Sequence, residues 1–173
     1  MRFFLVAVVL MVGAGANIAT AEVLDADPHG FTLLHEVTVT GTRATAWTAA
    51  VENIDKWWNA EHTISGKASL LSIDARPLGC FCEATGGGVV HLTVTTVSRD
   101  VNLRMTGGLG PLGLMGVNGN MTWEFFDVEG GTKIRFSYAV GGYSPQGLDT
   151  LAPAVDFVLG EALQRLKNYI DAG

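Results

Sequence analysis

The C-terminal end of the chain restricts the fold more than any other segment. Residues 150–172 carry apolar side chains at helical spacing with polar side chains mainly opposite, which indicates one long amphipathic helix. The apolar stripe comprises Leu151, Val155, Val158, Leu159, Ala162, Leu163, Leu166 and Ile170. The stretch of about eighty residues before this helix reads almost entirely as strands and turns. A single helix beside an antiparallel sheet buries its apolar face on that sheet, and where the sheet curves the two can enclose a cavity.

The earlier elements follow from periodicity and turn residues. A first strand is predicted over residues 31–40, and two short helices follow over 43–51 and 54–58, the first capped by Thr42. Asp149 or Thr150 can cap the final helix, with Pro153 in its first turn. Six further strands are predicted over residues 70–75, 80–84, 89–97, 101–106, 120–128 and 133–140. Tight glycine turns between them favour an antiparallel meander.

Two glycine-rich segments fall outside this strand pattern. Residues 107–119 combine six glycines with leucine, methionine and valine, and residues 141–147 carry Tyr143 and Pro145. The first is predicted to be a mobile apolar loop. Two interpretations stay open for it, because long irregular loops in small domains can be lids over a site or can simply fill the core.

The first residues have the pattern of a secretory signal peptide. Arg2 precedes an apolar run over residues 3–12, and Ala19-Thr20-Ala21 is a small-x-small cleavage site. The alternative, an uncleaved anchor helix, is disfavoured because the run is short for a bilayer and is followed by glycines. We therefore predict a signal peptide over residues 1–21, an N-terminal extension over 22–29 and one domain over 30–173, located in the periplasm or secreted.

The charge of the chain excludes several kinds of partner. The formal net charge is −6, and removal of residues 1–21 makes it about −7 because Arg2 is lost. An acidic chain without basic patches is not expected to bind nucleic acid or to attach to anionic lipid. Past the signal peptide no apolar run reaches transmembrane length, so no stable membrane insertion is expected. We expect no cofactor, and a monomer or weak dimer.

The two cysteines lie close together as Cys80-Phe81-Cys82. An even count in an exported chain suggests a disulfide. In a regular strand, however, residues i and i+2 lie near the upper Cα separation for a disulfide and their side chains are parallel, so the bond would require a local kink. The interpretation that we favour is two small apolar residues on one face of a sheet. A thiol site and a partial metal site remain as alternatives.

The order of elements resembles the helix-grip fold of the START-like, or Bet v 1-like (SRPBCC), superfamily. The similarity is greatest to the branch of the Hsp90 ATPase activator C-terminal domain and the polyketide cyclase-like proteins. It rests on the segments Ala44–Val51 with Trp47, Trp57-Trp58, Gly79–Glu83 and Gly131–Ile134, and it spans residues 30–172. Where this branch often has a glycine-glycine-aromatic turn, the chain has Gly79-Cys80-Phe81.

The resemblance implies an α+β fold in which a curved antiparallel sheet of six to seven strands grips the C-terminal helix around a hydrophobic tunnel. Members of the superfamily bind lipids, sterols or aromatic polyketides, a few catalyse cyclisation or hydrolysis, and others bind proteins. The fold therefore does not decide the function. A role with Hsp90 conflicts with export, because an exported chain would not meet that cytosolic chaperone.

Glu83 and His91 are the candidate catalytic residues. The turn at residues 86–88 would pair the two strands around it and bring these side chains to neighbouring positions, as general acid–base chemistry requires. Structural pairing across the hairpin is the alternative. A register that aligned His91 with Cys82 would instead bring together three metal ligands, Cys80, Cys82 and His91. Zinc prefers four, and no other histidine has the spacing to supply the fourth.

The remaining candidates are mainly aromatic and apolar side chains that could line a pocket. Tyr and Trp have a polar atom that a dry core must satisfy, which suits contact with an amphipathic ligand. The predicted ligand-binding residues are Trp57, Trp58, Cys82, Glu83, His91, Met105, Leu112, Leu114, Met115, Trp123, Tyr138, Tyr143 and Phe157. The leading hypothesis is an exported protein that binds a hydrophobic or amphipathic small molecule. The alternatives are a cyclase- or hydrolase-like enzyme using His91 and Glu83, and a protein-interaction module presenting the 107–119 loop.

Overall fold

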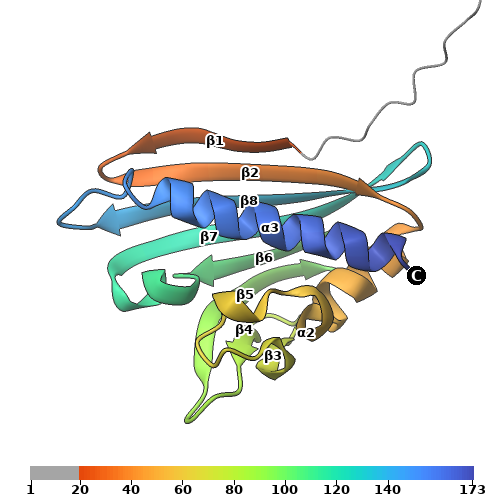
Figure 1. The fold of residues 1–173 in the computed structure, drawn as a ribbon, viewed down its shortest axis with the longest axis horizontal. Coiled ribbons are helices and arrows are strands. Elements are labelled where there is room, and N and C mark those ends of the chain that lie inside the picture. The colour runs from red at the N-terminus through yellow and green to blue at the C-terminus, as the bar shows by residue number, and fades with distance from the viewer. Residues whose placement is uncertain (1–19) are drawn as a thin grey trace, which may run out of the picture.

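The computed structural model describes residues 20–173, which form an antiparallel sheet of eight strands with one long helix across it (Figure 1). The strand order is β1-β2-β8-β7-β6-β5-β4-β3. The strands are β1 Thr20–Asp27, β2 Gly30–Val39, β3 Leu71–Ile73, β4 Cys80–Glu83, β5 Val89–Ser98, β6 Asn102–Gly107, β7 Gly116–Val128 and β8 Gly131–Tyr143. The predicted α+β helix-grip architecture is confirmed, with eight strands where six to seven were expected.

The helices lie where the sequence predicts them. After β2 come α1 (Arg43–Trp47), a π-helical turn (Thr48–Glu52) and α2 (Ile54–Trp57), and α3 (Ala152–Asp171) ends the fold. Short 3-10 turns occupy Ala60–His62, Ala68–Leu70 and Gly110–Leu114. The Thr42 hydroxyl accepts a hydrogen bond from the Thr45 amide at 3.3 Å, which confirms that cap. The cap predicted for α3 is wrong, because Leu151 occupies that position without a side-chain bond and the Thr150 hydroxyl donates to Gly147 O.

Strand β1 is the element that the sequence did not predict. It pairs with β2 from Thr20↔Glu36 to Asp27↔Gly30, and the Asp27 carboxylate closes the turn by accepting hydrogen bonds from the amides of His29 and Gly30. The segment 22–29, predicted as an extension, therefore supplies an edge strand of the sheet. Most of the predicted signal peptide, residues 1–19, lies outside the described residues.

The ends of both glycine-rich segments belong to strands, which shortens the two predicted irregular loops. Gly116 to Gly119 pair with β8 between Val140 and Tyr143, so that only residues 108–115 connect β6 to β7. Glycine is required here for space, because a Cβ at Gly119 would collide with the ring of Tyr138. Glycine usually weakens a strand, so the pattern pointed to a loop.

The core lies between the concave face of the sheet and the helices. Alternate residues of β2, β7 and β8 are buried, including Phe31, Trp123 and Phe136. Trp123 stacks on Phe136 with 4.3 Å between ring centroids, and Trp47 packs against Phe125 at 5.4 Å. Each fully buried side chain of this size contributes roughly 1.5–3 kcal/mol to folding.

The C-terminal end of α3 is tied to the end of β2. The Asp171 carboxylate accepts hydrogen bonds from the Thr40 amide at 2.8 Å and from Lys167 Nζ, and Lys167 Nζ also donates to Thr38 O. Burial raises the pKa of Asp171, but the hydrogen bonds from Lys167 and Thr40 outweigh it and leave this pKa below its usual value. These contacts fix how α3 lies on the sheet.

Candidate functional site

A cavity of about 350 Å³ lies between the N-terminal half of α3 and the β4–β5 part of the sheet. From α3 it is lined by Ala154, Val155 and Val158, and from the cap position before the helix by Leu151. The sheet and the segment before it contribute Trp58, Glu61, His62, Thr63, Ile64, Leu71, Phe81 and His91, and the β6–β7 connection contributes Leu109, Gly110, Pro111, Leu112 and Met115. Most of these side chains are apolar.

The cavity forms because α3 packs chiefly over one half of the sheet. Leu159, Ala162, Leu163 and Leu166 are buried against it, with β2 and β1 beneath the helix. The opposite half, β3 to β5, is covered by the segment around α2 and by the β6–β7 connection (Figure 1). Val155 and Val158 belong to the same apolar stripe of α3 but are only half-buried, because they face the space between these parts.

A β-bulge in β5 lets His91 and its neighbour Leu92 face the same side of the sheet. Phe81 pairs with Leu92 and the next residue, Cys82, pairs with Val90, so His91 is the extra residue. As a result His91 and Leu92 are both buried although they are consecutive. Bulges commonly re-aim a side chain in this way.

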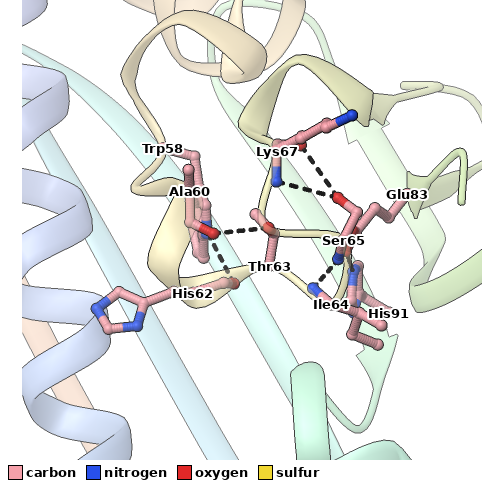
Figure 2. A network of polar contacts seen from close by, with 9 residues as sticks. All are labelled: Trp58, Ala60, His62, Thr63, Ile64, Ser65, Lys67, Glu83 and His91. Atoms are coloured by element: carbon pink, nitrogen blue, oxygen red, sulfur yellow. Dashed lines mark hydrogen bonds and ion pairs between the residues drawn. The ribbon is translucent and has the colours of Figure 1, made fainter.

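Glu83 and His91 form a buried pair beside the cavity. Glu83 Oε2 lies 3.2 Å from His91 Nε2, and their exposed fractions are 1% and 6%. Glu83 also accepts hydrogen bonds from the Ile64 amide at 3.0 Å and the Ser65 amide at 2.5 Å (Figure 2). The predicted proximity of these two side chains is confirmed.

Hydrogen bonds keep Glu83 ionised despite its burial. Burial alone raises the pKa of a carboxyl group, but hydrogen bonds from Ser65, the Ile64 amide and His91 outweigh it and lower the pKa of Glu83 below its usual value. A carboxylate therefore stands behind His91 near neutral pH.

Polar contacts attach the segment 57–62, which follows and includes the end of α2, to α3. Glu161 on α3 accepts a hydrogen bond from Asn59 Nδ2 at 2.8 Å and lies 2.7 Å from His62 Nε2. Arg165 Nε donates to Trp57 O at 2.8 Å. Trp58 Nε1 donates to His62 O at 3.2 Å (Figure 2), which holds the Trp58 ring against the cavity.

Cys80 and Cys82 form a disulfide, which corrects the interpretation of two unbonded small residues. Their Cα atoms are 5.4 Å apart, within the range that a disulfide spans. The kink that the bond requires coincides with the β-bulge opposite Cys82. The sulfurs lie on the face of β4 opposite Phe81 and Glu83, so Cys82 is not part of the cavity.

A Cys/Cys/His metal site is incompatible with this disulfide, because it leaves no thiolate to bind a metal. In the part of the chain that the structure describes, no group of three His, Cys, Asp or Glu side chains could hold a metal ion. No helix within residues 20–173 is long and apolar enough to cross a membrane.

The structure brings only some of the predicted ligand-binding residues to the cavity. Four line it, namely Trp58, His91, Leu112 and Met115. Glu83 lies behind His91. Four others are buried in the core away from it, namely Trp57, Met105, Trp123 and Tyr138. Three others are exposed, with fractions of 92% for Leu114, 73% for Tyr143 and 65% for Phe157, and Cys82 lies on the opposite face of β4.

Sequence reasoning missed most of the cavity wall. Val155 and Val158 of α3 were predicted only as part of the apolar stripe. Their position at the N-terminal end of the stripe, before the residues that are buried in the core, is the signal that could have identified them as cavity residues. The residues of the 61–64 segment carry no such signal, because their position depends on contacts with α3 and with Glu83.

Residues 28–171 match the family model described as polyketide cyclase / dehydrase and lipid transport. The chain belongs to this family. Strand β1 precedes the matched residues, and the cavity, Glu83 and His91 lie within them. Family membership agrees with the resemblance on which the fold was predicted.

Solved structures show the same fold. A putative uncharacterized protein from Rhizobium leguminosarum is 19% identical with a TM-score of 0.60, and the match covers 90% of this chain and 99% of that one. Ara h 8.0201 is 16% identical with a TM-score of 0.57, covering 83% and 99%. Aha1 from Colwellia psychrerythraea, solved as a dimer, is 16% identical with a TM-score of 0.53, covering 81% and 96%. Among curated protein sequences none matches the chain.

Proposed function

We propose that this protein is exported and binds a hydrophobic or amphipathic small molecule in the cavity between the sheet and α3. The observation that carries the proposal is the cavity of about 350 Å³ with walls that include Phe81, Val155 and Val158. Pockets for small molecules measure roughly 300–1,000 Å³ and are lined mainly by apolar side chains with a few polar groups. The cavity has both properties.

The apolar wall would provide most of the binding energy. About ten buried CH₂ groups contribute about 8 kcal/mol, while association costs at least about 4 kcal/mol in lost freedom. A purely apolar ligand of that size would therefore bind with a dissociation constant of about 1 mM or weaker. Tighter binding requires a polar contact or a larger ligand.

Two further observations support the proposal. The family description includes lipid transport, which is a function of small-molecule binding. The Cys80–Cys82 disulfide agrees with export, because disulfides persist in oxidising compartments. Export itself rests on the predicted signal peptide over residues 1–21.

A fluorescence titration tests the binding function. N-phenyl-1-naphthylamine, an apolar dye whose emission rises in apolar surroundings, is expected to bind the wild-type protein saturably at one site. Val155→Trp, which fills the cavity, should weaken binding at least tenfold. Gln164→Trp, on the exposed face of α3, is the matched control and should bind like the wild type. Equal binding to both variants, or no binding to the wild type, would overturn the proposal.

A second candidate is an enzyme in which His91 removes a proton from a bound substrate. The contact between His91 Nε2 and Glu83 Oε2 favours it, because a carboxylate that orients an imidazole also stabilises the imidazolium formed on proton transfer. This candidate predicts a chemical change in a ligand incubated with the wild-type protein, and loss of that change in a folded His91→Gln variant. A ligand recovered unchanged would count against it.

A further inference from the structure

One ring nitrogen of His91, a residue that lines the cavity, has no hydrogen-bond partner among the described residues. His91 is 6% exposed and lines the cavity, and its Nδ1 is buried without a hydrogen-bond partner among the described residues. Leaving a buried acceptor unpaired costs roughly 1–3 kcal/mol, and such atoms are uncommon in native proteins. The other nitrogen of the ring, Nε2, is hydrogen-bonded to Glu83 Oε2.

The surroundings of Glu83 decide which nitrogen carries the proton in the neutral ring. An ionised carboxylate only accepts hydrogen bonds. Both oxygens of Glu83 already accept bonds from the amides of Ile64 and Ser65, and the oxygen that faces His91 therefore requires a donor at Nε2 (Figure 2). A neutral imidazole has one donor and one acceptor. Nδ1 is then the acceptor, with its lone pair unused.

We propose that the cavity selects a neutral, mainly apolar molecule that carries a hydroxyl or N–H group, which donates a hydrogen bond to His91 Nδ1. This inference rests on the proposed function and names the class of ligand. A ligand with only a carbonyl or ether oxygen would place a second lone pair against Nδ1. An ionic ligand would lose its hydration among apolar walls such as those of Phe81 and Val158.

The test compares two probes that have similar shape and differ in the donor. We expect 2-naphthol to bind the wild-type protein roughly five- to tenfold more tightly than 2-methoxynaphthalene, as a neutral hydrogen bond to a buried acceptor predicts. In His91→Phe the preference should disappear. In His29→Gln, which changes an exposed histidine outside the cavity, it should persist.

The ring can also be observed directly without a ligand. In the wild-type protein with ¹⁵N-labelled histidine, long-range ¹H–¹⁵N correlation spectra should show His91 protonated at Nε2 and unprotonated at Nδ1. Glu83→Gln should shift the ring toward the opposite tautomer, because its amide can donate to Nε2. The preference for 2-naphthol should then fall as well. Because the wild-type spectra report the tautomer of His91 directly, they test the inference even if a variant fails to fold.

The outcomes separate this inference from the function on which it rests. Binding of both naphthalenes with equal affinity, or a proton found at Nδ1, would overturn the inference and leave the binding function intact. If neither naphthalene nor N-phenyl-1-naphthylamine binds, the proposed function and the inference are both overturned.

Discussion

The phenol of Tyr138 holds the backbone of Leu109. Its oxygen accepts a hydrogen bond from the Leu109 amide at 3.0 Å and donates one to Gly107 O at 3.0 Å. The ring reaches this position across Gly119, whose missing side chain leaves room for it. Since Leu109 begins the segment that closes one side of the cavity, Tyr138 positions that wall without lining it.

Removal of this phenol should loosen the wall. In Tyr138→Phe the amide of Leu109 and the carbonyl of Gly107 lose their partner, so we expect a loss of about 1–2 kcal/mol in the free energy of unfolding. Binding of N-phenyl-1-naphthylamine should weaken about three- to tenfold, as measured by titration. Binding that is unchanged in the folded variant would show that the 108–115 segment is held by its apolar contacts alone.

The stability of the protein should depend on pH through His35. His35 on β2 is buried, with Nε2 3.0 Å from Asp156 Oδ1 on α3, and Gly160 on α3 leaves space for its ring. Burial lowers the pKa of His35 by more than the carboxylate of Asp156 raises it. Below about pH 6.5 the unfolded chain therefore takes up a proton that the folded protein resists.

The free energy of unfolding should accordingly fall as the pH drops from about 6.5 toward 5, by up to about 1.4 kcal/mol per pH unit from this group. Urea unfolding at several pH values measures it. His35→Leu should flatten the curve in this window, whereas His29→Gln should leave it unchanged. A curve of the same slope in His35→Leu would contradict the assignment. Below about pH 4.5 the carboxyl groups of Glu83 and Asp171, with lowered pKa values, should add a further loss.

The disulfide should contribute little to stability. It closes a loop of only three residues, from Cys80 to Cys82, for which the loss of unfolded-state entropy corresponds to roughly 1.5 kcal/mol. The double variant with Cys80→Ser and Cys82→Ser should therefore fold and bind N-phenyl-1-naphthylamine. A reducing agent should destabilise the wild type by a similar amount and leave the double variant unaffected. Failure of the double variant to fold would show that the bond is needed to form the bulge at His91.

The fold could be predicted from the sequence because its signals are local. The alternation in β2, the glycine turns at 86–88 and 130–131, and the apolar stripe of α3 each act within one element, and the structure places these elements within a few residues of the predicted bounds. Strand β1 was not predicted, because Val23 and Leu24 are both exposed at the edge of the sheet and the strand shows no alternation between buried and exposed positions.

The candidate site could be predicted only in part. The proximity of Glu83 and His91 follows from the hairpin between β4 and β5. That Leu92 is buried beside His91 depends on the bulge, which no local pattern marks. Trp57 and Trp58 are adjacent and similar, yet Trp57 donates to Ala49 O within the core while Trp58 lines the cavity. The end of α2 decides which ring enters the core and which lines the cavity, because the backbone becomes extended at Trp58.

Native mass spectrometry of the protein purified from the cells that produce it tests the central claim, that the cavity holds a small molecule. We expect an additional mass of one small molecule that is released on denaturation, reduced in Val155→Trp and retained in Gln164→Trp. A wild-type protein that carries only its own mass, or an adduct equally abundant in Val155→Trp, would contradict it.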